Sequence, residues 1–246
     1  MFALMICVFL GVGCGSPTPV RSSSQPALVD SGAIANTPRH LTALREGTWT
    51  YDVVDGKGKG KTVTQVVKYD ASDESAPWRR VISADNVIEH IREETNGAIV
   101  MTAIELLDHG VVKTFDPPLI VMPAFEALGS PLTVTSKVVT TLRNGPTLGR
   151  GTAEVIMTPL QAETRETPAG SFECRVFEIR VNANLVLGQV QSSDTLAYAH
   201  GVGLVAETYV ENTTVFFIRS TTVRKTVLKE YHAPGKLEGV ETRRGS

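Results

Sequence analysis

Cysteine is scarce in this chain of 246 residues, which contains only three, at positions 7, 14 and 174. Two of them lie close to the N-terminus, so Cys174 is the single thiol in the body of the sequence. This excludes both a disulfide framework and a CxxC metal site. We expect Cys174, within the alternating run 172–181, to be a small buried apolar side chain rather than a nucleophile.

An excess of charge of either sign is also missing. The chain has 24 Lys and Arg residues against 26 Asp and Glu residues, a formal net charge of −2. This balance excludes a strongly basic nucleic-acid-binding protein and an acidic tail protein. We therefore expect no nucleic-acid partner.

Motifs of catalysis and of metal binding are absent as well. The five histidines lie far apart in the sequence and none belongs to an HExxH pair, and no GxSxG elbow is present. Gly56 to Thr62 resembles a phosphate-binding loop. However, only three residues lie between Gly56 and Gly60 where the motif requires four, and the segment joins two predicted strands. The sequence thus predicts a protein that is not an enzyme and has no catalytic residue, no cofactor and no metal. The lysines of the segment 56–62, Lys57, Lys59 and Lys61, are expected to form a solvated turn able to touch anionic lipid headgroups.

The only long apolar run, Met1 to Gly13, is too short to span a membrane. As a helix it would rise about 20 Å, against about 30 Å of hydrocarbon. We interpret residues 1–13 as a signal peptide; a buried N-terminal helix is the alternative. Leu10 to Gly13, followed by Cys14, resemble the lipobox of bacterial lipoproteins. The resemblance implies that Cys14 is lipidated and becomes the first mature residue, which would anchor the protein in the cell envelope, at the outer membrane facing the periplasm.

Ser, Pro, Ala and Gly dominate the sequence from Gly15 to about Thr37. Such a composition buries too little apolar surface to offset the entropy of ordering the chain. We expect residues 14–38 to be a flexible tether, residues 39–232 to form one β-domain, and residues 233–246 to be a polar tail.

β-branched residues are abundant, with 30 Val and 27 Thr, and this excess favours sheet over helix. Apolar residues recur at period two, as in Trp49, Tyr51 and Val53. Asn96-Gly97 is a strong hairpin signal. These patterns predict nine or ten strands with short links, and hence a large antiparallel sheet.

Two segments do not fit a simple series of strands. Ser83 to Glu94 has both a capping residue and apolar residues at helical spacing, so it could be a helix or a strand. Pro117 to Leu128 is apolar but contains three prolines, and we predict a loop with a short helical turn that covers an opening of the sheet. In this interpretation its apolar side chains gate a ligand entrance; those assigned to the gate are Leu119, Ile120, Met122 and Phe125.

Three segments resemble one group of uncharacterised bacterial secreted and lipid-anchored β-proteins. The first contains Gly47, Trp49 and Tyr51, the second runs from Thr167 to Cys174, and the third from Tyr198 to Val205. The architecture of this group is similar to the curved antiparallel half-barrel of the LolA/LolB lipoprotein carriers. The resemblance implies a mainly β fold: a large curved antiparallel sheet, or half-barrel, with one or two short helices.

Two functions remain open at this point. In the first, a lipid-anchored envelope protein without catalytic activity binds an apolar ligand or a partner segment on its curved sheet. In the second, a structural or scaffolding lipoprotein has a filled core and binds an envelope protein partner. An apolar cavity would favour the carrier, whereas a close-packed interior would favour the scaffold.

Overall fold

The computed structural model describes residues 44–124, 129–185 and 188–232. Within these ranges the chain forms thirteen strands and a single 3₁₀ turn, η1. The elements are β1 (Gly47–Gly56), β2 (Thr62–Tyr69), β3 (Trp78–Ile82), β4 (Val87–Glu93), β5 (Ile99–Leu106), η1 (Leu107–His109), β6 (Val111–Met122), β7 (Leu132–Leu142), β8 (Thr147–Pro159), β9 (Glu163–Thr167), β10 (Gly170–Leu185), β11 (Gly188–Ala199), β12 (Gly203–Val215) and β13 (Ile218–His232).

The sheet closes on itself, and the prediction of an open half-barrel is therefore wrong. Neighbouring strands pair antiparallel in the order β11-β12-β13-β1-β2-β3-β4-β5-β6-β7-β8-β10, and β10 then pairs with β11. The closing pair runs without a break from Cys174–Ala199 to Leu185–Gly188. Twelve strands form the ring, while β9 pairs only with the start of β10. Closure satisfies the backbone groups that an open sheet would leave exposed at its edges.

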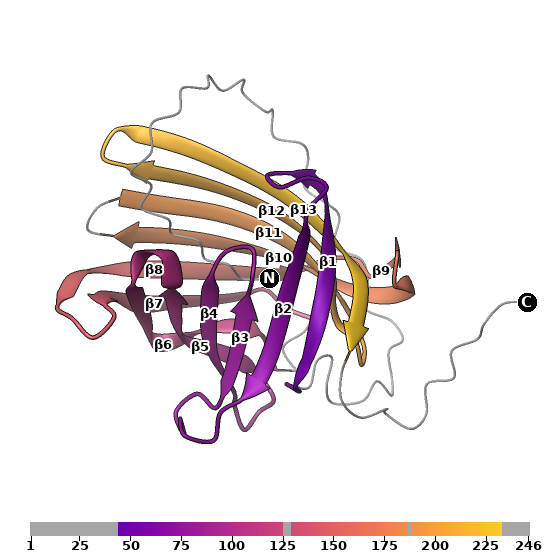
Figure 1. The fold of residues 1–246 in the computed structure, drawn as a ribbon, viewed down its shortest axis with the longest axis horizontal. Helices are drawn as coiled ribbons and strands as arrows, with labels where there is room; N and C mark the ends of the chain where they lie inside the picture. The colour runs from indigo at the N-terminus through magenta and orange to yellow at the C-terminus, as the bar shows by residue number, and fades with distance from the viewer. Residues whose placement is uncertain (1–43, 125–128, 186–187, 233–246) are drawn as a thin grey trace, which may run out of the picture.

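Antiparallel order gives the ring two distinct ends. One end, here called the tip end, carries the turns β1–β2, β3–β4, β5–β6, β7–β8 and β12–β13. The other end, called the tether end, carries the turns β2–β3, β4–β5 and β11–β12 and the first residue of β1, Gly47. Figure 1 shows the β12–β13 turn at the upper left, the β1–β2 turn at the top near the centre, and the β2–β3 turn at the bottom of the view.

Side chains inside the ring also contact strands that are not their immediate neighbours. In Figure 1 the strands β10–β13 run across the molecule at a steep angle to β1–β5. The Trp49 indole Nε1 of β1 donates a hydrogen bond of 2.8 Å to the carbonyl oxygen of Val202, which precedes β12. Large side chains from eight strands are completely buried inside the ring. These are Tyr51, Ile82, Ile91, Met101, Ile104, Leu119, Ile179, Leu196 and Leu228.

The predicted short helices are not found in the described residues, where η1 is the only helical element. The segment left open between helix and strand contains β4, in which Val87, Glu89 and Ile91 are buried and alternate with half-buried residues. This is the period of a strand with one face inside the barrel. The spacing in the sequence is also compatible with a helix because Ile88, which lies on the outer face, is apolar like the buried Val87 and Ile91.

The proline-rich segment also differs from its prediction, because residues 117–122 belong to strand β6 and not to a covering loop. Thr114 pairs with Ala103 of β5, and the next β5 pair joins Leu119 to Met101. Pairing of β6 with β7 ends at Asp116. Pro117 and Pro118 thus occupy a stretch where the ladder is interrupted on both sides, which is where residues without an N–H are tolerated.

Strand β12 continues past Glu211 and Asn212 to Val215, and the chain reverses at Phe216 and Phe217. Phe216 has a φ of 53°, a conformation rare for a bulky residue. No Gly, Asn or Pro marks this turn. The described residues form thirteen strands, more than the nine or ten predicted.

Candidate functional site

The interior of the barrel contains a cluster of charged side chains among its apolar residues. Along β4, β6, β11, β12 and β13, acidic and basic residues stand at positions that the alternation assigns to the inner face. They are buried at 0 to 8% exposure. The buried charged residues are Glu89, Lys113, Asp194, Glu207, Glu211 and Arg224.

Arg80 and Glu89 form an ion pair between β3 and β4. The Arg80 Nε donates to the Glu89 carboxylate, and the two residues are directly opposite each other in the ladder. The Glu89 side chain is completely buried, and the Arg80 side chain is 13% exposed. Burial raises the pKa of Glu89, and the Arg80 guanidinium opposes this shift. Glu89 is therefore held in a dry environment by one cationic partner.

Asp194 and Glu207 bring two further carboxyl groups close together from β11 and β12. Asp194 is 1% exposed and Glu207 is 2% exposed. Burial raises the pKa of Asp194 well above its ordinary value, and the Glu207 charge raises it further. The Asp194 Oδ1 atom has no hydrogen-bond partner. An ionised Asp194 is thus costly at this position.

A third group lies toward the tip end of the barrel. Arg224 Nη1 is 3.0 Å from Asp85 Oδ1, an ion pair that joins β13 to the β3–β4 turn. The Tyr209 hydroxyl donates to Glu211, whose other oxygen accepts a 3.1 Å hydrogen bond from Thr213 Oγ1. The Arg224–Asp85 pair joins parts of the wall that are 139 residues apart in the sequence, whereas Tyr209, Glu211 and Thr213 all lie on β12.

Carboxyl groups outnumber cations in this interior. Together with Asp85 and Arg80, the charged side chains comprise five acids and three bases. Such an imbalance favours a protonated carboxyl group at neutral pH, and Asp194 has the raised pKa expected of it. The arrangement can store a proton, but its members are almost inaccessible to a dissolved substrate.

Replacing Asp194 by Asn should stabilise the protein at pH 8. Because the folded state raises the pKa of Asp194, its ionisation opposes folding as pH rises above the ordinary Asp value near 4. Asn mimics the protonated form at every pH. We expect a melting temperature above that of the parent at pH 8, by roughly 2–4 °C for each kcal/mol gained, and a difference that shrinks toward pH 4. A constant difference across this range would contradict burial of an ionisable Asp194.

Residues predicted to gate a ligand lie mainly in the barrel wall. In strand β6, Leu119 and Met122 are buried and Ile120 is half-buried, and all three pair with residues of β5. Phe125 lies outside the described residues, as does the lipidation candidate Cys14. The gating role stays a prediction.

The three segments that carried the family resemblance come together at the tether end. Trp49 of the first segment bonds to Val202 of the third, and the Tyr51 hydroxyl donates a 3.2 Å hydrogen bond to the carbonyl oxygen of Leu204. Cys174 of the second is buried, as expected. Their contacts are with one another and with the core, which agrees with a structural role.

Sequence reasoning missed the charged interior because it assigned charged residues to the outer face. The signal was present in the alternation: Glu89 stands between Val87 and Ile91, two positions from each. Lys113 likewise stands two positions before the buried Phe115. A charged residue in phase with buried apolar residues on a strand marks a buried charge.

Neither a metal site nor a membrane-spanning helix was identified. Within 44–124, 129–185 and 188–232, no group of three or more His, Cys, Asp or Glu side chains is placed to hold a metal ion. In the same ranges, no helix has the length and hydropathy needed to cross a bilayer.

Comparison with known proteins finds similarity in structure only. No protein-family model matches the sequence, and no curated protein matches it. A candidate lipoprotein of Parabacteroides distasonis is 15% identical, with 78% of this chain and 98% of that chain covered and a TM-score of 0.41. The hypothetical lipoprotein YmcC of Escherichia coli is 13% identical, with coverages of 79% and 90% and a TM-score of 0.38. A candidate exported protein of Bacteroides fragilis with a YmcC-like fold is 14% identical, with coverages of 76% and 96% and a TM-score of 0.38. At these TM-scores the likeness adds nothing to the assignment of function.

Proposed function

We propose that this chain is a lipid-anchored protein of the bacterial cell envelope that acts as a scaffold, binding a protein partner through its outer surface. The N-terminal sequence supports the anchor, since Cys14 follows a short apolar run and precedes a Ser- and Pro-rich stretch. The interior of the barrel supports the scaffold in preference to the carrier.

The filled interior is the observation that favours a scaffold over a carrier. A carrier for an apolar ligand needs an open lumen, whose lining side chains would be accessible. Here the inner face is occupied by large side chains such as Tyr51, Ile104 and Leu196, each no more than 1% exposed. The middle of the barrel is also charged, with Arg80 and Glu89 paired inside it, which disfavours an apolar ligand.

The same burial supports a function without catalysis. General acids, bases and nucleophiles must reach the reacting atoms of a substrate. The carboxyl groups with raised pKa, including Glu89 and Asp194, are 0 and 1% exposed. Cys174 is 2% exposed, and burial raises the pKa of its thiol, which lowers its reactivity.

Replacing Cys14 by Ser tests the anchor. The expected result is that the parent chain is found in the membrane fraction with acyl mass on its first residue, while Cys14→Ser becomes soluble or stays unprocessed. Fractionation followed by intact-mass measurement gives both readouts. Cys174→Ser is the matched control, because it removes a thiol that is buried in the barrel. Equal membrane recovery of the Cys14→Ser chain and no acyl mass on the parent would contradict the anchor.

A further inference from the structure

The β12–β13 hairpin ends in an exposed apolar tip. Phe216 is 71% exposed, Phe217 is 98% exposed and Ile218 is 68% exposed. The first β13 residue that pairs with β1 is Arg224, whereas β12 pairs with β11 as far as Val215. The hairpin therefore extends beyond the β1–β2 turn and is supported on one side by β11, as the upper left of Figure 1 shows.

Exposed apolar residues gather at this end of the barrel. Ten large hydrophobic side chains are exposed in the described part of the chain, and eight of them lie at or near the tip end. Single exposed apolar residues are ordinary, but their concentration at one end marks an interaction surface. The eight are Val54, Leu107, Leu142, Leu148, Phe216, Phe217, Ile218 and Val223; the other two are Tyr69 and Tyr231.

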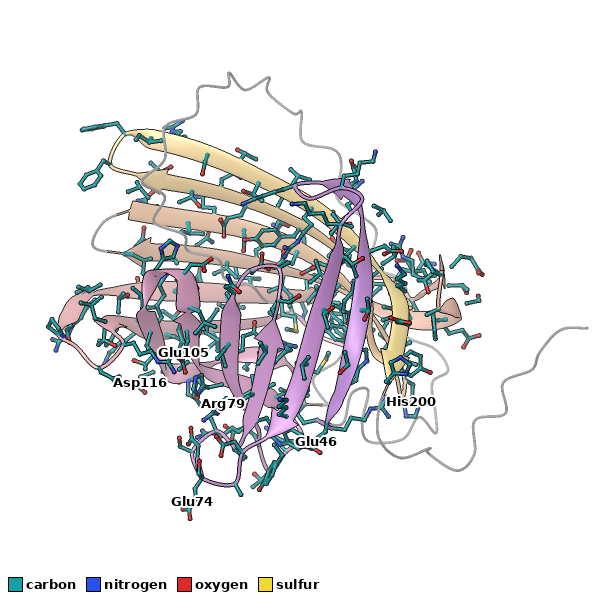
Figure 2. The ribbon with its side chains drawn as sticks, in the orientation of Figure 1. Glu46, Glu74, Arg79, Glu105, Asp116 and His200 are labelled. Atoms are coloured by element: carbon teal, nitrogen blue, oxygen red, sulfur yellow. The ribbon has the colours of Figure 1, made fainter. Side chains whose placement is uncertain are left out.

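The turns at the two ends of the barrel also differ in their charged residues. In the described turns of the tip end, Lys57, Lys59, Lys61 and Arg143 stand against Asp85 and Asp108; Asp85 is paired with Arg224, and Arg143 with Glu105. The described turns of the tether end contain Asp70, Asp73, Glu74 and Glu94 and no Lys or Arg; of these acids, Asp70 and Asp73 are paired with Arg79 of β3 and Glu94 with Arg92 of β4. Figure 2 shows Glu74 on the β2–β3 turn, with Glu46 and His200 on the same lower side.

We infer that the tip end is a membrane-contact surface that takes anionic phospholipid. Aromatic and aliphatic side chains at a protruding tip enter the interface between headgroups and acyl chains. The lysines of the β1–β2 turn lie farther back along the same hairpin, beside Val223 and Arg224, and would attract anionic headgroups to this end of the barrel. A protein partner would also accept the apolar tip, but the lysines at the same end favour an anionic bilayer.

This surface would complement the proposed anchor without depending on it. Thirty-two residues separate Cys14 from Gly47, the start of β1 at the tether end. Extended, they would reach about 110 Å, so the anchor alone would not fix which end of the barrel meets a membrane. Contact through the tip end would fix the orientation.

Vesicle binding of the full chain carrying Cys14→Ser tests the inference with the lipid anchor removed. The chain should sediment with vesicles of equal parts phosphatidylcholine and phosphatidylglycerol, and less with phosphatidylcholine alone. Adding Phe216→Ser, Phe217→Ser and Ile218→Ser should weaken binding roughly 100-fold. Lys59→Gln and Lys61→Gln should weaken it by roughly fivefold for each charge, and added salt should do the same.

Tyr69→Ser in the same background is the matched control, since it removes an exposed aromatic residue at the tether end, and it should leave binding unchanged. Any contribution of residues 1–13 cancels, because every chain compared retains them. An unchanged melting temperature verifies that the tip variant is folded. In a further chain with Phe217→Trp, tryptophan emission should shift to the blue when vesicles are added. Three results would overturn the inference, whatever the state of Cys14. They are vesicle binding of the triple tip variant equal to that of the Cys14→Ser chain, no binding of the Cys14→Ser chain to vesicles with phosphatidylglycerol, and no emission shift of the Phe217→Trp chain.

Discussion

Replacing Arg80 by Met should lower the free energy of unfolding by about 3–5 kcal/mol, the usual cost of breaking a buried ion pair from one side. The cost arises because Glu89 would remain buried without its cationic partner. Glu89 is completely buried, and its second oxygen, Oε1, already has no hydrogen-bond partner. Without Arg80 the carboxylate must remain charged in a dry interior or take up a proton. Urea denaturation of parent and variant at neutral pH measures the effect.

Arg79→Met is the matched control for Arg80, because it makes the same change at the adjacent position on the opposite face. Arg79 is paired with Asp73 at 2.7 Å, but Asp73 is 30% exposed and stays hydrated when its partner is lost. We expect a cost of about 1 kcal/mol or less. The double variant Arg80→Met/Glu89→Leu should recover most of the loss. Equal costs for Arg79→Met and Arg80→Met would contradict the buried pair.

Replacing Trp49 by Ala should cost about 3–5 kcal/mol, a large part of a domain stability of about 5–15 kcal/mol. Trp49 is 8% exposed, and its indole N–H donates a hydrogen bond to the carbonyl oxygen of Val202, just before β12 and two strands away in the ring. The variant loses a large apolar side chain and leaves the Val202 carbonyl without that donor. Trp49→Phe, which keeps most of the apolar surface, should cost less. A melting temperature of Trp49→Ala within about 2 °C of the parent would show that Trp49 does not anchor the barrel.

Local pattern determines most of the strands. Alternation predicted β1 from Trp49, Tyr51 and Val53 and the middle of β10 from the run 172–181, and Asn96-Gly97 predicted the turn between β4 and β5. Gly97 has the positive φ, 80°, that such a turn uses. The turn at Phe216 was missed because a bulky residue takes that conformation there, and its aromatic side chain signals a strand instead.

Closure of the sheet could not be predicted in the same way. Pairing of β10 with β11 requires the turn after Leu185 and all twelve residues of β11, a strand with Gln, Ser and Asp at several positions. Its polar residues conceal the inner face, because Ser192 and Asp194 point into a charged interior. The cations Arg80, Lys113 and Arg224 come from three other strands, β3, β6 and β13. Glu89 and Lys113 stand in phase with buried apolar residues on their own strands, but the partners of a buried charge follow only from the assembled barrel.

Native mass spectrometry of the full chain, extracted in mild detergent, tests the filled interior most directly. The account predicts the mass of the chain, beginning at Cys14 with its covalent acyl groups, and no noncovalently bound lipid after detergent is removed. A filled core leaves no room for a ligand. A folded species that carries a copurified lipid, released when the barrel unfolds and unaffected by the Phe216→Ser, Phe217→Ser and Ile218→Ser changes at the tip, would contradict the scaffold and restore the carrier.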